Sequence, residues 1–411
     1  MPRLFGAGRQ GKSNKPKMKK ITCVLLLAFL LTIVYVENQA NATDYNQRLK
    51  EIADSVMNYY QQSKGITDGG IFIEVNAPSG NYLVSSGLDA GFNANYHFRM
   101  ASCTKTFTAA AIMYLHQQGK LNIYETITSD IPGTSEPYIP NTPFFDVPNK
   151  SAITIELLLQ HRSGVFDVSN TEIPNNVQQP YAGQLYTEYM LNLDPSHTFT
   201  FAELVGVAAA NDLSYFTPGS AYHYSNTGYS MLGEIIERVS GMSYHDFLQN
   251  SFFTPLGMTN TSAPYTGTDI KMPSPFLQSY LYEGGIQTNT TAENMSAHVS
   301  EGNLISTPAE LIKWNKALLT GQTVINQSTA DLMMQVVSNG QGGYYGLGIS
   351  YIEGLGFGHS GAHISFLTFM YYNPVTDITI LVGTNFWDLD QLGAQLQGLV
   401  DVSKTSVAVL E

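Results

Sequence analysis

The segment from Phe98 to Leu115 holds the residues of this chain that are best suited to chemistry. Ser102 and Lys105 lie three positions apart, and the apolar residues that follow them recur at three- and four-residue intervals, which predicts a buried helix. Side chains at that spacing share one helix face. The first helical turn has unpaired N–H groups and a partial positive charge, so an oxyanion would be stabilised there. Burial disfavours the charged form of Lys105, which could then accept the proton of Ser102.

A helix-capping serine followed by a surface lysine is the alternative interpretation of this spacing. Two features favour chemistry: S-x-x-K occurs once in the chain, and the predicted helix carries almost no other charge as far as His116. Cys103 could itself be read as a nucleophile. Its place about 100° around the helix from Ser102 favours a buried packing role instead.

Two further short motifs carry groups that could act on a substrate. Tyr224 and Asn226 flank one serine before a predicted helix; a tyrosine hydroxyl near a lysine can relay a proton, and an amide can bind a carbonyl. Packing over a turn and helix capping is the alternative. His359, Ser360 and Gly361 begin a predicted strand, where glycine permits close approach and an edge could pair with a peptide-like substrate. The histidine could carry charge or protons, or be an ordinary loop residue.

Residues 1–42 have the pattern of a signal peptide. Basic residues precede an apolar run at 21–36, and the sequence from Ala40 to Ala42 fits the small-x-small cleavage pattern. A retained membrane anchor is the alternative. Cleavage would leave 13 basic and 32 acidic residues, a formal net charge of −19, which argues against nucleic acid as a partner. With Cys23 removed, Cys103 would have no disulfide partner.

The order of strand-like and helix-like segments predicts an α+β fold. Strand patterns occur at 71–86 and again at 345–384, so we expect one antiparallel sheet built from both ends of the chain and flanked by helices. This α/β region would comprise 43–122 and 300–411, and a mostly helical, loop-rich region, 123–299, would be inserted between its halves. Residues 43–411 would form one catalytic unit. The chain has no G-x-S-x-G or H-E-x-x-H motif, and His359 and His363 lack an evident third metal ligand.

Taken together, these motifs resemble the serine β-lactamase and penicillin-binding superfamily. S-x-x-K, Y-x-N and H-x-G occur in the family's order, and the strings LLLQHRSGV at 157–165 and EGNLISTPAELIKWNKALL at 301–319 are similar too. The resemblance spans about 45–400 and is nearest to class C-like D-alanyl-D-alanine carboxypeptidases. It implies a β-lactamase/transpeptidase-like fold and hydrolysis through an acyl-enzyme.

The resemblance also implies a role for each motif residue. Ser102 would be acylated, with Lys105 and Tyr224 as its proton partners, and either of the two could be the general base. The backbone N–H groups of Ser102 and Ala362 would form the oxyanion hole. The acyl amide and the substrate carboxylate would be bound by Asn226, His359, Ser360 and Gly361. No metal and no cofactor is implied.

One departure from the family bears on the substrate. Some related peptidases bind the substrate's terminal carboxylate with an arginine on the strand before H-x-G, but this chain has no arginine or lysine between Lys316 and His359. The leading hypothesis is an exported (periplasmic or secreted) serine hydrolase like the D-alanyl-D-alanine carboxypeptidases. Its candidate substrates are small peptides or esters, including peptidoglycan stem peptides and β-lactams. An esterase, a class C-like β-lactamase and a non-catalytic penicillin-binding homologue are the alternatives. No nucleic-acid partner is expected, and a membrane only if the leader is retained.

Overall fold

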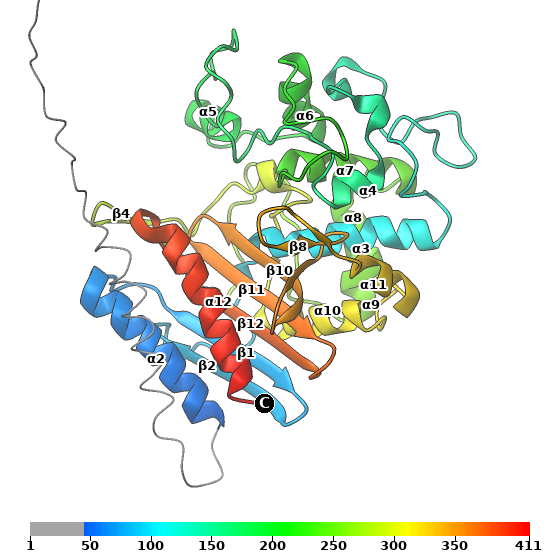
Figure 1. Cartoon of the computed structure of the whole chain (residues 1–411). Helices are drawn as coiled ribbons and strands as arrows, with labels where there is room; N and C mark the ends of the chain where they lie inside the picture. The colour runs from blue at the N-terminus through cyan, green and yellow to red at the C-terminus, as the bar shows by residue number, and fades with distance from the viewer. Residues whose placement is uncertain (1–44) are drawn as a thin grey trace, which may run out of the picture. The chain divides into compact units, whose positions relative to one another are not determined.

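The computed structural model describes residues 45–411, and the predicted signal peptide lies outside these residues. They form an α+β fold around one eight-stranded antiparallel sheet with the order β2-β1-β12-β11-β10-β9-β8-β7 (Figure 1). The sheet strands are β1 (Ile71–Ala77), β2 (Gly80–Ser86), β7 (Val337–Ser338), β8 (Tyr344–Tyr345), β9 (Ser350–Ile352), β10 (Gly356–His363), β11 (Phe366–Asn373) and β12 (Ile378–Thr384). The prediction of a sheet built from both ends of the chain is confirmed.

Strands from the first and last parts of the described chain lie side by side in this sheet, as its second and third strands. β1 and β2 form a hairpin, and β1 also pairs antiparallel with β12, so that Ile71 lies opposite Thr384. β12 continues through β11 to β10, the strand that carries the H-x-G motif. The β1–β2 hairpin and the β11–β12 hairpin thus form one continuous part of the sheet, which ends at the strand with the H-x-G motif.

Helices cover both faces of the sheet (Figure 1). α2 (Tyr45–Lys64) and α12 (Leu392–Ala408) pack together on one face, where Leu49 and Leu399 are among the buried residues. The other helices are α3 (Thr104–Gln117), α4 (Ile155–Leu159), α5 (Tyr186–Leu193), α6 (Phe201–Ala210), α7 (Asn226–Ser240), α8 (Tyr244–Leu248), α9 (Thr254–Leu256), α10 (Pro308–Leu319) and α11 (Gln327–Met333). Among the described residues, no helix combines the length and apolar character needed to cross a bilayer.

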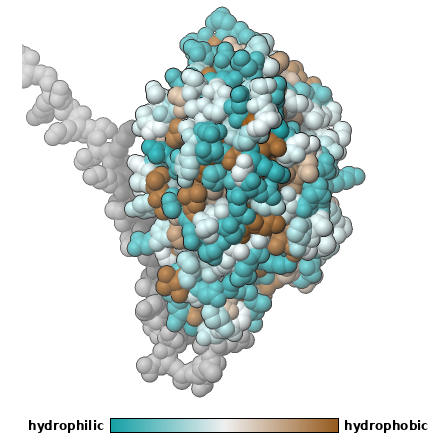
Figure 2. Space-filling view, turned by 90° about the vertical axis from the view of Figure 1, so that its right-hand side faces the viewer, coloured by the Kyte–Doolittle hydropathy of each residue, from teal (hydrophilic) through white to brown (hydrophobic). Residues whose placement is uncertain are grey.

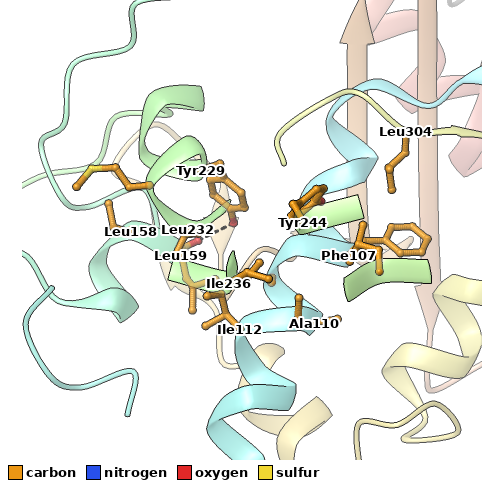
Figure 3. Close-up of a cluster of buried hydrophobic side chains, with 14 of the residues drawn as sticks. Phe107, Ala110, Ile112, Leu158, Leu159, Tyr229, Leu232, Ile236, Tyr244 and Leu304 are labelled. Carbon is orange, nitrogen blue, oxygen red and sulfur yellow. Dashed lines mark hydrogen bonds between the residues drawn. The ribbon is translucent and has the colours of Figure 1, made fainter. Parts of the chain in front are cut away.

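A second, larger core surrounds α3 on the opposite side of the sheet. Figure 3 shows side chains of α3 facing side chains of α4 and α7, and the Tyr229 hydroxyl donates to the Leu159 carbonyl at 3.0 Å. Phe107 of α3 stacks on Trp314 of α10, with ring centroids 3.8 Å apart. α3 is therefore held by apolar contacts on several sides, which fixes the position of its first turn.

On the face of the molecule drawn in Figure 2, hydrophobic residues form small groups separated by hydrophilic ones.

Several elements differ from the sequence-based expectation. Ser102 lies in a short 3-10 helix, η1 (Ala101–Cys103), and α3 begins after it. Asn226 is the first residue of α7 and does not precede the helix as predicted, because Ser225 caps it by accepting a bond from the Gly228 N–H. Most residues of the region 123–299 lie in loops and turns, and its regular elements are mainly helices, but it also contains a small hairpin that joins β13 (Phe386–Asp388). The strands of that hairpin are β4 (Tyr280–Glu283) and β5 (Ile286–Asn289).

Candidate active site

Ser102 and Lys105 lie on one side of the first turns of this helical segment, as the S-x-x-K spacing predicts. Lys105 Nζ is 3.3 Å from Ser102 Oγ. The Lys105 side chain is fully buried, whereas Ser102 is half-buried and reaches the surface. Ser102 is therefore partly open to solvent, and the nitrogen beside it is shielded from solvent.

Lys105 is surrounded by acceptors from three separate segments. Its Nζ lies 2.8 Å from Asn226 Oδ1 and 2.8 Å from the Glu301 backbone carbonyl, and 3.2 Å from Glu301 Oε2. A neutral amine donates two hydrogen bonds and accepts one. The two shortest contacts can take both donors, which leaves the lone pair for the Ser102 hydroxyl. Burial lowers the pKa of Lys105, against the raising effect of Glu301, and so favours this neutral form.

Tyr224 completes the predicted trio. Its side chain is half-buried and hydrogen-bonded to Ser102, and its ring centroid lies 4.7 Å from Lys105 Nζ. Burial raises the pKa of Tyr224 well above its usual range, so the hydroxyl is a neutral donor at neutral pH. His161 holds the segment around it: its carbonyl accepts from the His223 N–H at 3.0 Å and its Nδ1 from the Ser225 N–H at 3.1 Å. The His161 ring centroid lies 4.1 Å from that of Tyr224.

Asn226 is oriented by a buried aspartate that the sequence interpretation missed. Asp167 Oδ2 accepts the Asn226 N–H at 2.9 Å, and Asp167 Oδ1 accepts both the N–H and the hydroxyl of Ser169. The Ser169 hydroxyl in turn accepts from Asn226 Nδ2 at 3.1 Å. This leaves Asn226 Oδ1 directed at Lys105. The local D-x-S spacing at Asp167 is a turn signal, but nothing in the sequence indicated its contact with Asn226.

Replacing Asp167 by alanine is expected to destabilise the fold by about 2–4 kcal/mol, because the buried groups that donate hydrogen bonds to its carboxylate would lose their acceptor. Urea unfolding of the variant would measure the loss. The matched control is Asp194→Ala, since Asp194 accepts the N–H and hydroxyl of Ser196 in the same D-x-S pattern but is exposed. Equal losses for the two variants would contradict this account of Asp167.

β10 brings the H-x-G motif directly against η1. Its first residues pair with β9 as far as Gly358, and the segment from His359 to His363 pairs with β11. A Cβ built on Gly361 would lie 2.5 Å from the Met100 carbonyl oxygen and 3.0 Å from Ser102 N. Glycine is thus required for this approach, which brings Ala362 beside the serine turn. The oxyanion role of these two backbone N–H groups stays a prediction.

His359 does not offer the charge that the sequence interpretation considered. It is 3% exposed, and its Nε2 lies 2.8 Å from the Tyr345 hydroxyl while Nδ1 lies 2.5 Å from the Ser360 carbonyl. Burial, reinforced by Lys105, lowers the pKa of His359 to about 3, so the imidazole is neutral. Of the motif's two polar side chains, the half-buried Ser360 is the more accessible to a ligand.

The residues on either side of Ser102 have structural roles. Ala101 adopts φ 52°, a left-handed conformation that is unusual for a residue with a Cβ and costs about 1 kcal/mol or more. Cys103 is fully buried, its thiol contacts the His359 carbonyl at 3.3 Å, and burial raises its pKa. Its predicted packing role fits this environment. Within residues 45–411, no cluster of three or more His, Cys, Asp or Glu side chains is arranged to hold a metal ion.

Comparison with known proteins places this geometry in a family. The family model described as Beta-lactamase matches residues 83–400, which include all the residues discussed above. The chain belongs to the Beta-lactamase family. This assignment confirms the superfamily that the motifs resemble.

Several curated proteins are similar in sequence to this member of the Beta-lactamase family. It is 27% identical over 265 residues to "Penicillin-binding protein 4*" of Bacillus subtilis, a match that covers 62% of this chain and 52% of the relative. It is 26% identical over 294 residues to "Protein flp" of Staphylococcus aureus, which covers 70% of this chain and 52% of the relative. The chain therefore spans about half the length of the curated relatives that it matches.

Solved structures share the fold over most of the chain. A D-stereospecific amidohydrolase from Streptomyces sp. superimposes with a TM-score of 0.70 at 21% identity, covering 88% of this chain and 98% of its own. A D-amino acid amidase from Ochrobactrum anthropi superimposes with a TM-score of 0.69 at 23% identity, covering 90% and 99%. At these identities the likeness establishes the β-lactamase/transpeptidase fold.

Proposed function

We propose that this chain is a serine hydrolase that cleaves amide bonds on the carboxyl side of a D-amino acid residue through an acyl-enzyme on Ser102. The observation that carries the proposal is the 3.3 Å contact between buried Lys105 Nζ and accessible Ser102 Oγ. The names of the penicillin-binding relative and of the D-amino acid amidase support D-alanyl peptides and amides as the first substrate class.

The proposed acylation step moves one proton and forms one bond. Ser102 Oγ bonds to the substrate carbonyl carbon while its proton passes to the neutral Lys105 amine, and the carbonyl electrons move onto oxygen. The backbone N–H groups of Ser102 and Ala362 would stabilise the oxyanion. Collapse breaks the C–N bond; the leaving amine takes the Tyr224 hydroxyl proton, and the Lys105 ammonium returns a proton to Tyr224. Water then cleaves the acyl ester and regenerates Ser102 with the released acid.

The charges around β10 favour substrates without a free terminal carboxylate. The segment between Lys316 and His359 has no basic residue, and His359 is neutral. A carboxylate bound near Ser360 would therefore gain no positive charge from this segment or from His359, and burying a poorly paired charge is costly. We therefore propose D-alanyl amides, and peptides whose terminal carboxylate is blocked, as better substrates than peptides that end in free D-alanyl-D-alanine. The motifs alone had favoured the latter.

Hydrolysis of D-alanine p-nitroanilide is expected, with kcat/KM at least about tenfold higher than for its L-isomer and for a D-alanyl-D-alanine peptide with a free carboxylate. Two quantities would be measured: the release of p-nitroaniline, and the intact mass of the protein after incubation with a fluorescent penicillin. Equal rates on the free-carboxylate peptide would restore the carboxypeptidase hypothesis. Activity on D-alanine methyl ester alone would indicate an esterase, and penicillin hydrolysis without an adduct a β-lactamase. No turnover and no adduct would identify a non-catalytic homologue.

A further inference from the structure

Glu301 makes contacts that the acylation step described above does not use. One carboxylate oxygen, Oε2, lies 3.2 Å from Lys105 Nζ, and the other, Oε1, lies 2.5 Å from His298 Nδ1. The side chains of Lys105, Glu301 and His298 are 0%, 3% and 16% exposed. One buried carboxylate is therefore shared between two groups that can each carry a positive charge. Glu301 is held in place because its own backbone carbonyl also accepts from Lys105 at 2.8 Å.

We propose that Glu301 and His298 are positioning residues that set the protonation state of Lys105, an inference that rests on the proposed function. The Glu301 carboxylate needs one positive partner to offset its burial. When His298 supplies that charge, Lys105 remains the neutral amine that accepts the Ser102 proton. When His298 is neutral, the same carboxylate favours the Lys105 ammonium, which cannot act as a base.

The electrostatics of the three groups agree with this division of charge. Although burial opposes both effects, Glu301 raises the pKa of His298, and Lys105 with His298 lowers the pKa of Glu301. Burial lowers the pKa of Lys105 in spite of the carboxylate. Each direction favours a charged His298–Glu301 pair beside an uncharged Lys105 near neutral pH.

Other ionisable groups also act on these residues and stay in place when the pair is changed. Asp167 and Glu301 favour the charged form of Lys105, while Glu293 favours the charged form of His298. The remaining titratable or aromatic neighbours of Lys105 are Cys103, His161, Tyr224, Tyr229 and His359. His363 lies against His298 with ring centroids 4.3 Å apart, and burial lowers its pKa well below the usual range, with His298 and Arg99 adding to the effect. Replacing Glu301 or His298 removes one of these groups, and the loss of His298 also removes its lowering effect on the pKa of His363.

The test is the pH dependence of kcat/KM for D-alanine p-nitroanilide in Glu301→Gln and His298→Gln. Loss of the carboxylate makes Lys105 a weaker base, so the acidic limb of the profile should move to lower pH by about one unit. Loss of the histidine charge leaves the carboxylate acting on Lys105 alone, so the limb should move to higher pH by a similar amount. Opposite shifts are the expected result, and a purely structural role would lower the rate without them.

Two controls and one fallback variant make the outcome decisive. Wild-type protein must first hydrolyse D-alanine p-nitroanilide; absence of turnover refutes the proposed function, whereas turnover with unshifted limbs refutes this inference alone. His197 Nε2 and Glu203 Oε1 form a comparable pair at 2.8 Å that contacts none of the site residues named above, so Glu203→Gln should leave the profile unchanged. Shifts of both site variants in one direction would overturn the proposal. If Glu301→Gln does not fold, the upward shift of His298→Gln decides the matter.

Discussion

Replacing Ser102 by alanine is expected to abolish the covalent adduct with a fluorescent penicillin and to lower kcat for amide hydrolysis by about 10⁴-fold or more. The Ser102 hydroxyl is the accessible group within 3.3 Å of the buried Lys105 amine, and alanine leaves nothing to be acylated. Intact mass after incubation with the antibiotic measures the adduct, and steady-state release of p-nitroaniline measures the rate.

The matched control is the neighbouring Cys103→Ala variant. Because the Cys103 thiol is buried against the His359 carbonyl, its removal should leave the mass of the adduct unchanged. An adduct that persists in Ser102→Ala, or that disappears in a folded Cys103→Ala protein, would show that Ser102 is not the nucleophile.

Replacing Gly361 by alanine is expected to lower kcat by about 10²-fold and the free energy of unfolding by about 1–3 kcal/mol. The added methyl would lie 2.5 Å from the Met100 carbonyl oxygen, 2.9 Å from Ala101 Cβ and 3.0 Å from Ser102 N. Two of these are backbone atoms, so β10 and the serine turn must move apart. That displacement would separate Ser102 from Ala362. Urea unfolding and steady-state kinetics on the same sample measure both effects.

Gly398→Ala supplies the opposite control. Gly398 lies in α12, and a Cβ built there meets no atom within 4 Å outside the helix's own backbone. Alanine at a helix interior should stabilise the protein by about 0.5–1 kcal/mol and leave kcat unchanged. A Gly361→Ala protein that behaves like Gly398→Ala would contradict the close approach of β10 to the serine turn.

The sequence allowed prediction of the features that depend on local spacing. Ser102 and Lys105 lie three positions apart, so any helical turn brings them together. The hairpins at 71–86 and 366–384 follow from alternating patterns around turn residues, and a sheet from both ends follows from their positions. Tyr224 and Asn226 could be assigned to the same site as Lys105 because the order of the three motifs in the chain matched that of a known family.

Features that depend on distant contacts could not be predicted in this way. Glu301 lies 196 positions from Lys105 and Asp167 lies 59 positions from Asn226, and neither spacing has a period that a pattern can detect. The expectation that His359 could carry charge failed for a similar reason. Its burial depends on Tyr345 and on the packing of β10 against η1, which no property of the H-x-G triplet reveals.

The pairing of β1 with β12 also determines when an active molecule can exist during synthesis. A chain that has been made only as far as α11 already contains Ser102, Lys105, Tyr224 and Glu301, but β1 still has an unpaired edge and the serine turn has no β10 beside it. The candidate site therefore remains incomplete until about the last fifth of the chain has emerged and folded back onto the first hairpin. The order of assembly thus keeps the proposed site incomplete until late in synthesis, while the open edge of β1 is exposed to wrong strand pairing until β12 covers it.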